Sequence, residues 1–359
     1  MIGIIFSSGL IKEIAGGIAE GEPLIDHALF YMSLACKERT AICFYALKHI
    51  SLEEKTVKAY VYEYPFCELV QKKISIPLVN LYRGEGYLRK ERSIHKIKEL
   101  GRQGIIFLNA VTNKERSKYA VYKYLQTKKR IAPYLPETSE LNFGHLQLYL
   151  KKYRTVFVKP RRGSKGNHIY IFRDLGHFYQ VFQVLKQQKL IKWIPKNKLY
   201  QYYQTSFSSP RKYMIQQGIP LKEYKGNKFD IRVSPQKNRH NRWQVTGMIA
   251  RIAPPGWLVT NLDQGGQAKS NLNKLIKPET KQEIRRLSLR IAKAIEKRTP
   301  QAIDLGVDFA VDEQERIWVL EVNFRPLRRK VWIRRHRTPF AYACSLYRRK
   351  LEEMSVGPG

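Results

Sequence analysis

Two apolar segments near the carboxyl end carry acidic residues inside a β-strand pattern, and no other feature constrains the fold as strongly. The segments are 307–312 (VDFAVD) and 316–323 (RIWVLEVN), and together they predict a β-hairpin. If the loop between the two strands comprises residues 313–316, Asp312 pairs with Ile317. This register decides which polar side chains meet, because directly opposed residues have Cβ atoms about 4.5–5.5 Å apart.

The same register places Asp308 opposite Glu321, and Asn323 follows two residues later. Residues two apart in a strand point to the same face of the sheet. Three oxygen-bearing side chains, two of them carboxylates, therefore converge. Such a set suits Mg²⁺, which takes hard oxygen ligands and completes its shell with water and substrate phosphates. The alternative, a solvated acidic face, is disfavoured by the apolar neighbours in so basic a chain.

A strand, a glycine-containing loop and a second strand follow one another at 155–172. The first strand, TVFVKP, contains Lys159 near its end, and the loop contains Gly163 and Gly166. Glycines allow such a loop to present backbone N–H groups to phosphate oxygens. The GxxxxGKS/T phosphate-binding loop, which opens a helix, is absent. An ordinary basic hairpin is the alternative interpretation.

Two further arginines lie on the predicted strands between these regions. Asp230 and Arg232 share one face of the segment FDIRV, and Arg251 and Asn261 belong to the segment ARIAPPGWLVTNLDQGG. Two guanidinium groups and an amide on neighbouring strands could hold a γ-phosphate and the charge that develops as it is transferred. The alternative is that these are surface arginines of a basic protein.

The first 110 residues alternate short apolar runs with amphipathic ones, a pattern typical of a parallel α/β sheet. They contain no GxGxxG sequence, so no dinucleotide site is predicted. The predicted strands are 2–6, 41–46, 76–82 and 104–110, and the predicted helices lie around 24–36 and 93–101.

The remaining chain also mixes helices and strands. The pattern predicts helices at 115–130, 142–153, about 175–190 and 279–298. It predicts strands at 155–160, 168–172, 212–219, 229–236 and 242–252, in addition to the hairpin. Only the last residues, SVGPG, are expected to form a loose tail.

Positive charge is concentrated in two parts of the chain. The protein has 66 Lys and Arg against 30 Asp and Glu, a formal net charge of +36. Residues 141–222 contain sixteen basic residues and one acid, Asp174, and residues 325–350 contain ten basic residues and no acid. Such a field attracts nucleic acid, an anionic cell-wall or spore polymer, or an acidic substrate. A solvated basic face without a dedicated partner remains the alternative.

The cysteines and the hydropathy indicate a reducing compartment. Cys36, Cys43, Cys67 and Cys344 show no metal-binding spacing and are expected to be free thiols. No run reaches the roughly 18 apolar residues of a membrane helix, and the opening segment reads as a strand and not as a signal peptide. We therefore expect cytoplasmic synthesis.

The order of these segments resembles that of an ATP-grasp domain. Lys118 in a helix is followed by VFVKPRRGSKG, MIQQGI, FDIRV, ARIAPPGWLVTNLDQGG and GVDFAVDEQERIWVLEVNFRP. The chain is most similar to the YheC/YheD family of endospore-coat-associated ATP-grasp proteins, over about 105–350, and more distantly to the ligases that add glutamate to ribosomal protein tails. One departure is that Leu327 follows Pro326, where relatives commonly have glycine.

The resemblance implies a mixed α/β and α+β architecture, with a parallel α/β pre-ATP-grasp domain before a two-lobed ATP-grasp domain. The implied boundaries are 1–110 for the first domain, 111–350 for the second and 351–359 for a tail. Within the second, the ATP-clasping lobe would span about 150–220 and the Mg-binding lobe about 225–350.

The resemblance also implies roles for individual residues. Lys118 and Lys159 would contact the α- and β-phosphates, and Arg232 would face the γ-phosphate or acyl-phosphate. Arg251 and Asn261 would assist. The residues closing over the triphosphate would be Arg161, Gly163, Ser164, Lys165 and Gly166. The hinge meeting adenine would comprise Gln216, Gln217, Gly218 and Ile219. The Mg²⁺ ligands would be Asp308, Glu321 and Asn323.

The implied activity is an ATP- and Mg²⁺-dependent ligase that joins an unidentified carboxylate to an unidentified amine through an acyl-phosphate. The resemblance also implies association with the forespore or the spore coat. One alternative is a structural protein that keeps the fold and binds an anionic spore-coat or cell-wall polymer through 325–350. Another is nonspecific binding of nucleic acid.

Overall fold

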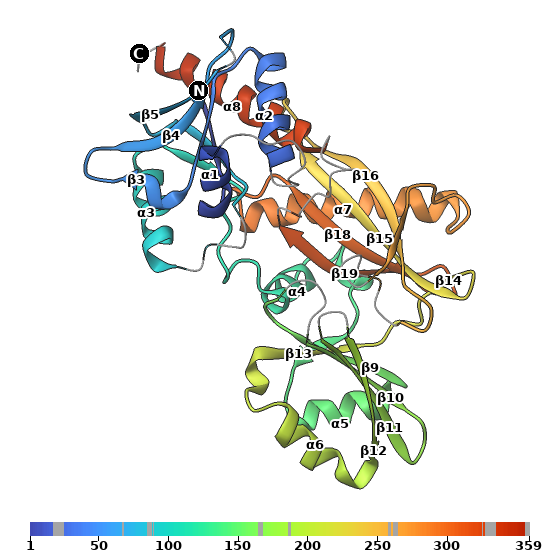
Figure 1. Ribbon diagram of the computed structural model, residues 1–359. Coiled ribbons are helices and arrows are strands. Elements are labelled where there is room, and N and C mark those ends of the chain that lie inside the picture. Colours follow the sequence, from blue (N-terminus) through green and yellow to red (C-terminus); the bar gives the residue numbers. More distant parts are fainter. Residues whose placement is uncertain are drawn as a thin grey trace.

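A computed structural model of the chain contains three β-sheets that follow one another along the sequence (Figure 1). The structure describes residues 1–16, 25–66, 68–84, 88, 90–163, 168–185, 188–257, 260, 265–324, 326 and 335–355. We call the three sheets the amino-terminal sheet (β1–β7), the middle sheet (β8–β13) and the carboxyl-terminal sheet (β14–β19). The middle sheet lies at one end of the molecule, and the carboxyl-terminal sheet lies between it and the amino-terminal sheet.

The amino-terminal sheet has the strand order β3-β4-β2-β1-β6-β7, with β5 paired to β4. The pairs β1–β2, β1–β6 and β6–β7 are parallel, as the alternating pattern predicts. The strands are β1 (Ile2–Ile5), β2 (Ile42–Tyr45), β3 (Ile50–Ser51), β4 (Thr56–Tyr62), β5 (Leu69–Ser75), β6 (Val79–Tyr82) and β7 (Ile106–Leu108). The accompanying helices are α1 (Ser8–Ala15), α2 (Ile25–Glu38) and α3 (Glu91–Arg102).

Strands β3 to β5 extend this sheet in the antiparallel sense and were not predicted from the sequence. Their sequence does contain the period of two that marks a half-buried strand. In β4, Val57, Ala59 and Val61 are buried, whereas Lys58 is exposed.

The middle sheet is antiparallel, with the order β12-β11-β10-β9-β13-β8. Its strands are β8 (Thr138–Glu140), β9 (Thr155–Pro160), β10 (Ile169–Asp174), β11 (Phe178–Leu185), β12 (Gln188–Pro195) and β13 (Tyr213–Gln217). Helices α5 (Phe143–Lys152) and α6 (Leu199–Ser206) cover one face, which buries aromatic and aliphatic side chains of both layers. Helix α5 begins after Asn142, whose side chain accepts a hydrogen bond from the His145 N–H at 2.7 Å.

The helix predicted around 175–190 is wrong, because this segment forms β11 and the start of β12. Phe178, Val181 and Phe182 have helix-like spacing, which suggested one apolar stripe. In the strand they divide between two faces. Val181 packs toward α5 and α6, whereas Phe182 joins a small apolar cluster on the opposite face. A strand that is apolar on both faces cannot be separated from a helix by periodicity alone.

The carboxyl-terminal sheet has the order β17-β16-β15-β18-β19, with β14 paired to β15, and all its pairs are antiparallel. The strands are β14 (Glu223–Tyr224), β15 (Asn227–Lys237), β16 (Trp243–Ile252), β17 (Gln267–Lys269), β18 (Leu305–Val311) and β19 (Ile317–Phe324). Helix α7 (Pro278–Arg298) packs its apolar stripe against this sheet and closes the largest core. Its first residue is proline, which suits a position without an intrahelical N–H partner.

Two helices connect the layers. Helix α4 (Lys118–Gln126) is shorter than the predicted 115–130 segment and packs beside β19. Helix α8 (Arg337–Ser355) was not predicted, and it inserts Phe340 and Cys344 into the core of the amino-terminal sheet. The expected tail begins with Ser355, which still belongs to α8, and the residues after it lie outside the described part of the chain. Among the described residues, no helix combines the length and apolar character needed to cross a membrane.

The described cysteines agree with the expectation of free thiols. Cys36, Cys43 and Cys344 form no disulfide, and Cys43 and Cys344 are buried. Cys67 lies outside the described residues.

Candidate functional site

In the β18–β19 hairpin, Asp308 lies opposite Glu321 as predicted, but the register that brings them together differs from the predicted one. The expected pairing of Asp312 with Ile317 is wrong, because Val311 pairs with Ile317. A β-bulge between Asp308 and Phe309 then shifts the register by one residue, which restores the predicted opposition. Bulges of this kind re-aim side chains and are common beside functional sites.

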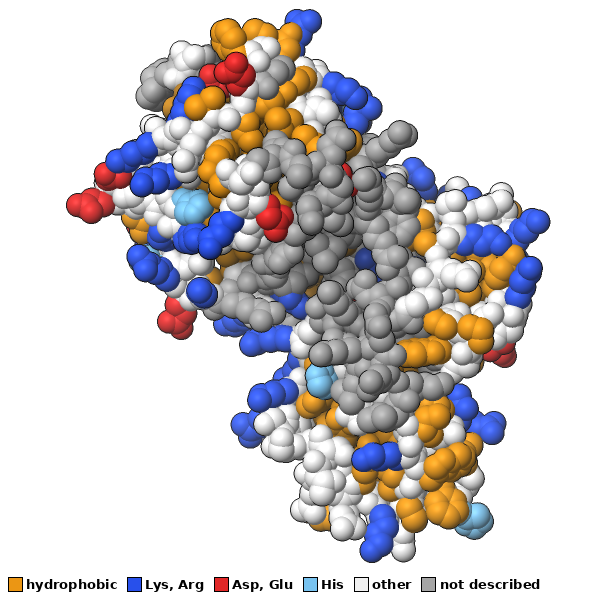
Figure 2. Space-filling model, in the orientation of Figure 1, with side chains coloured by type: hydrophobic (Ala, Val, Ile, Leu, Met, Phe, Trp, Pro, Cys, Tyr) orange, Lys and Arg blue, Asp and Glu red, His pale blue; other side chains and the backbone are white. Residues whose placement is uncertain are grey.

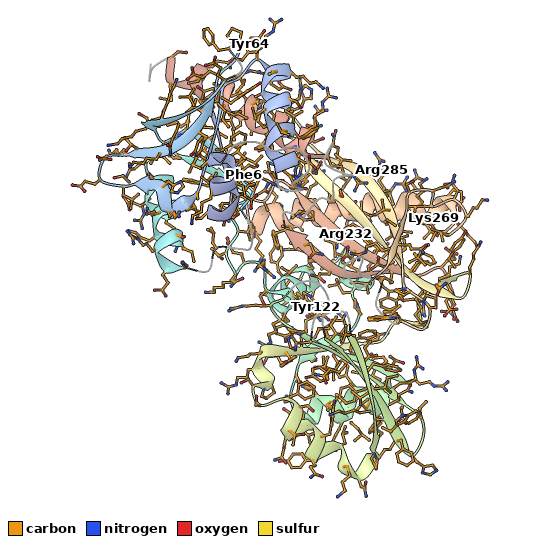
Figure 3. The ribbon with its side chains drawn as sticks, viewed as in Figure 1. Phe6, Tyr64, Tyr122, Arg232, Lys269 and Arg285 are labelled. Carbon is orange, nitrogen blue, oxygen red and sulfur yellow. The ribbon has the colours of Figure 1, made fainter. Side chains whose placement is uncertain are left out.

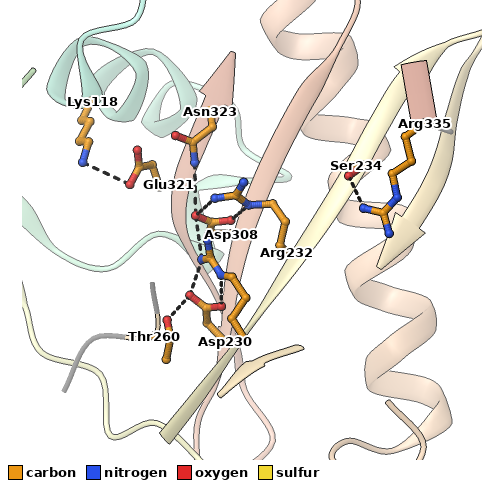
Figure 4. Close-up of polar contacts among 10 residues, drawn as sticks. Lys118, Asp230, Arg232, Ser234, Thr260, Asp308, Glu321, Asn323 and Arg335 are labelled. Atoms are coloured by element: carbon orange, nitrogen blue, oxygen red, sulfur yellow. Dashed lines mark hydrogen bonds and ion pairs between the residues drawn. The ribbon is translucent and has the colours of Figure 1, made fainter. Parts of the chain in front are cut away.

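Asp308 is the centre of a buried polar cluster (Figure 4). Its carboxylate accepts a bidentate interaction from Arg232, in which the Nη2–Oδ2 distance is 2.8 Å. Arg251 Nη2 lies 3.0 Å from the same Oδ2, and Asn323 Nδ2 donates to it at 3.2 Å. Burial opposes ionisation of this carboxyl, but the two guanidinium groups outweigh it and hold its pKa below the usual value.

A second buried carboxylate, Asp230, holds Arg251 from the other side. Arg251 donates to it through Nε at 2.7 Å and Nη2 at 2.5 Å, and Thr260 Oγ1 donates at 2.5 Å. Desolvation raises the pKa of Asp230, even though Arg251 opposes this shift. The sequence placed Asp230 on the Arg232 face but gave it no role, and Thr260 was missed. The usable signal was a carboxylate inside the apolar strand FDIRV.

Lys118 and Glu321 connect α4 to the hairpin. The Lys118 Nζ lies 3.2 Å from Glu321 Oε2, so the helix contributes a cation to the edge of the cluster. The backbone N–H of Lys118, at the first residue of α4, also donates to the carbonyl of Arg161 at 2.9 Å. The start of this helix is thereby fixed to the end of β9.

Lys159 extends from β9 on the middle sheet. Its Nζ donates to Gln216 Oε1 at 2.7 Å, and Gln216 Nε2 donates to Thr138 Oγ1 at 3.0 Å. Burial, together with the nearby charge of Lys118, lowers the pKa of Lys159 to about 8, although three carboxylates act in the opposite direction. The protonated form of such a lysine is strongly favoured when an anion approaches, because an opposite charge stabilises the ammonium group.

The loop after β9 is only partly described. Arg161 donates through Nε to the Tyr213 carbonyl at 3.0 Å, and its guanidinium lies over the ring of Tyr119. Gly163 has a φ of 154° and its carbonyl accepts a hydrogen bond from Arg116. The predicted site residues Ser164, Lys165, Gly166 and Asn261 lie outside the described residues.

The predicted hinge residues follow β13. Gln217 is bonded to the backbone of Glu137 through both its main chain and its side chain. Gly218 lies directly against β9, because a Cβ there would be 2.5 Å from the Thr155 carbonyl oxygen. Ile219 is the next residue, and it leads toward the carboxyl-terminal sheet. The hinge thus leaves the middle sheet at a point where its backbone lies tightly against β9.

A pocket lies between α4, β13 and β19. It is lined by Lys118, Tyr122, Gln216, Leu320 and Glu321, among other residues. Its walls combine apolar side chains with amide, ammonium and carboxylate groups. Figure 3 shows Tyr122 at this junction and Arg232 close to the middle of the molecule.

The hairpin carries groups whose chemistry fits a hard divalent cation. Asp308 and Glu321 supply carboxylate oxygens and Asn323 supplies an amide oxygen, the ligand type that Mg²⁺ takes. Within the described part of the chain, no cluster of three or more His, Cys, Asp and Glu side chains has the arrangement of a metal site. The hairpin itself offers a cation two carboxylates and one amide oxygen.

Two curated proteins of Bacillus subtilis (strain 168) are similar to this chain in sequence. The endospore coat-associated protein YheD is 29% identical over 321 residues, which cover 85% of this chain and 69% of YheD. The endospore coat-associated protein YheC is 23% identical over 229 residues, covering 60% of this chain and 61% of YheC. The match therefore spans less than two thirds of the length of YheC.

Comparison of the structures supports the fold assignment. The crystal structure of D-alanyl-alanine synthetase A from Vibrio cholerae O1 biovar eltor matches with a TM-score of 0.54 at 11% identity, covering 96% of this chain and 97% of the other. The likeness shows a common ATP-grasp fold of mixed α/β sheets. The family model for YheC/D-like ATP-grasp proteins matches residues 106–346. The chain therefore belongs to the YheC/D-like ATP-grasp family.

Proposed function

We propose that this protein is an ATP-dependent ligase that joins a carboxylate to an amine. The observation that carries the proposal is the placement of two lysines and two arginines around the acidic hairpin. Lys159 comes from the middle sheet, Lys118 from α4, and Arg232 and Arg251 from the carboxyl-terminal sheet. Four cations from three parts of the fold surround one small volume, an arrangement suited to a triphosphate and the charge that moves during its transfer.

In this proposal the two lysines bind the α- and β-phosphates, and the hinge 216–219 contacts adenine. The lowered pKa of Lys159 supports its part, because a partly neutral amine regains its proton when phosphate approaches. The residues of the loop 161–166 close over the nucleotide. Arg232 faces the γ-phosphate. Arg251, which is hydrogen-bonded to Asp230 on the neighbouring strand, adds a second positive charge near this phosphate.

Asp308, Glu321 and Asn323 would hold Mg²⁺, which would neutralise phosphate charge when bound. In the structure, arginine and lysine side chains pair with both carboxylates. The two guanidinium groups lower the pKa of Asp308 against the effect of burial, because opposite charges favour the ionised carboxylate. The same cations are then in place to turn toward phosphate oxygens.

The proposed reaction has two steps. A substrate carboxylate oxygen attacks the γ-phosphorus, and the bond between this phosphorus and the β-phosphate oxygen breaks. The products are ADP and an acyl-phosphate. An amine then attacks the acyl carbon, phosphate departs, and the amine loses a proton. Arg232 and Arg251 stabilise the charge on the transferred phosphoryl group, so the contribution of the protein is mostly positioning and electrostatics.

We also propose the division into a domain at 1–110 and an ATP-grasp domain at 111–350. Association with the forespore or spore coat is proposed from the names of YheD and YheC. The acid and the amine are not identified by these relatives.

Binding of an anionic polymer is a second candidate, supported by the charge. Lys and Arg side chains are spread over the face seen in Figure 2 and outnumber the acidic ones there. However, two arginines of α8 make structural contacts: Arg348 pairs with Glu38, and Arg349 donates to the carbonyl of Arg239. A polymer role predicts an affinity that falls steeply with salt, and an affinity independent of salt would contradict it.

Calorimetric titration with a nonhydrolysable ATP analogue tests the main proposal. It is carried out with and without Mg²⁺, at an ionic strength that suppresses nonspecific anion binding. One-to-one, Mg²⁺-dependent binding is expected, and absence of binding would refute a nucleotide site. Glu321→Gln should abolish ATP turnover in screens of acids and amines. Intact turnover in this variant would show that the metal ligands are assigned wrongly.

A further inference from the structure

A third guanidinium group lies on the same strand face as Arg232, farther from the nucleotide lysines. Arg335, just before α8, donates through Nη1 to Ser234 Oγ at 3.2 Å (Figure 4). Ser234 follows Arg232 by two residues in β15, so the two positions are about 7 Å apart at 3.3–3.4 Å per residue. One small substrate is long enough to reach both guanidinium groups.

The sheet is shaped to accept Arg335. A β-bulge between Val233 and Pro235 places two residues of β16, Thr246 and Gly247, opposite Ser234. The Arg335 guanidinium lies flat against this bulge, because a Cβ at Gly247 would be only 2.4 Å from its Cζ and Nη2 atoms. Only glycine leaves this space. The bulge and the glycine thus hold the guanidinium against the sheet at this point.

Burial and a neighbouring like charge both act on Arg335. Burial lowers the pKa of Arg335, the carboxylate of Asp304 opposes this shift, and the charge of Arg232 adds to it. Asp304 also accepts hydrogen bonds from Arg83 at 3.2 Å and Gln236 at 2.8 Å, so its charge is shared among several donors. An anion bound beside Arg335 would favour its charged form and offset the effect of Arg232.

On the basis of the proposed ligase function, we propose that Arg335 and Ser234 form a carboxylate-binding subsite for the second substrate. The substrate class is then an amine that also carries a carboxylate, such as an amino acid or the end of a peptide. The guanidinium would bind the carboxylate, with the Ser234 hydroxyl holding its orientation. Arg232 would meanwhile face the phosphoryl group at the reacting end.

NMR of the uniformly ¹⁵N-labelled full chain tests the subsite directly. The Arg335 Nε–Hε signal is assigned by its loss in Arg335→Lys, and sodium acetate is titrated at constant ionic strength against sodium chloride. A saturable shift of this signal is expected with the wild-type protein. Sodium phosphate forms the second arm of the experiment. A response to phosphate without a response to acetate overturns the assignment as a carboxylate site.

Three variants separate a built subsite from general positive charge. Gly247→Ala keeps every charge but places a methyl group where the guanidinium lies, so acetate affinity should fall at least tenfold. Ser234→Ala should weaken it severalfold by removing one hydrogen bond. Arg337→Gln removes an exposed charge two residues from Arg335 and should leave the affinity unchanged.

Each result bears on the subsite or on the ligase proposal separately. The ATP analogue is titrated into the same samples. Nucleotide binding without an acetate response overturns the subsite and leaves the ligase proposal standing. An acetate response without nucleotide binding supports the subsite and refutes the ligase proposal. An acetate affinity in Gly247→Ala equal to that of the wild-type protein overturns the subsite, and an unchanged affinity in Ser234→Ala overturns the part assigned to the Ser234 hydroxyl.

Discussion

Asp230 should be the residue whose loss most disturbs the carboxyl-terminal sheet. It is 3% exposed and accepts two hydrogen bonds from Arg251 and one from Thr260. Asp230→Asn keeps the shape of the side chain but removes its charge and its capacity for a bidentate bond with the guanidinium. Arg251 is then left buried with a single carboxylate partner, Asp308.

Removing one partner of a buried ion pair typically costs about 3–5 kcal/mol, because the other charge stays buried without compensation. Arg251 keeps its contact with Asp308 at 3.0 Å, so the lower end, about 3 kcal/mol, is expected. Since about 1.4 kcal/mol corresponds to a factor of ten, opening of the surrounding strands should become roughly 150-fold more frequent.

Hydrogen exchange followed by mass spectrometry measures this opening peptide by peptide. Peptides from β15 and β16 should exchange about two orders of magnitude faster in Asp230→Asn, under conditions where exchange reports local stability. Asp174→Asn is the matched control, because it removes the same charge from a partly exposed pair with Lys196. Such a pair is worth about 0–1 kcal/mol, so β15 and β16 should be unaffected.

Less than a tenfold change in β15 and β16 would refute the argument that Asp230 compensates a buried charge. The double variant Asp230→Asn/Arg251→Met provides a second check. It should be less destabilised than the sum of the two single variants, because no buried charge of that pair remains uncompensated. Strict additivity would show that the two side chains do not act as a unit.

Three further predictions concern the nucleotide site and the amino-terminal core. The Lys159 pKa of about 8 rises when phosphate binds, so analogue binding near pH 8 should take up protons and binding near pH 6 should not, with the difference lost in Lys159→Met. Calorimetry in two buffers of different ionisation enthalpy measures it, and equal proton uptake at both pH values would contradict it. Gly218→Ala puts a methyl group 2.5 Å from the Thr155 carbonyl and should weaken analogue binding at least tenfold. The control is Gly101→Ala in a helix, where the new Cβ meets no atom within 4 Å and binding should not change. Equal affinities of the two variants would refute the close hinge contact. Gly3→Ala places its Cβ 2.1 Å from a buried asparagine oxygen and should cost about 1–3 kcal/mol by overpacking, read as a lower thermal midpoint; an unchanged midpoint would contradict it.

Local patterns predicted the short apolar strands and the long amphipathic helix. Strands β1, β2, β6 and β18 are buried along their whole length, and short continuous apolar runs bounded by turns are typical of buried strands. Helix α7 has a single apolar stripe, which predicts a helix. The prediction was wrong at β11, where both faces are apolar and Phe182 and Val181 mimic a helical stripe. Helix α8 was missed because residues 325–350 were considered only as a basic segment, although the residues between Arg337 and Arg348 are uncharged and include Phe340, which packs on the amino-terminal sheet.

Residue type was enough to predict the candidate site residues, but not the side chains with which they interact. A carboxylate or lysine inside an apolar strand is costly to bury, so Lys159, Asp308 and Glu321 could be selected from the sequence. The sequence could not show that Asp308 meets two arginines, because Arg251 comes from another strand and is itself fixed by Asp230. The predicted loop residues 164–166 and Asn261 lie outside the described part of the structure and stay predictions.

The sequence by itself determined the order of the elements, the acidic hairpin face and the excess of positive charge. These features depend on neighbouring residues along the chain. Only the tertiary structure decided the bulge that restores the opposition of Asp308 and Glu321, and the placement of Arg335 over Gly247. Both depend on contacts between distant segments, whose geometry is set by packing and by the compensation of buried charge, and no local pattern encodes it.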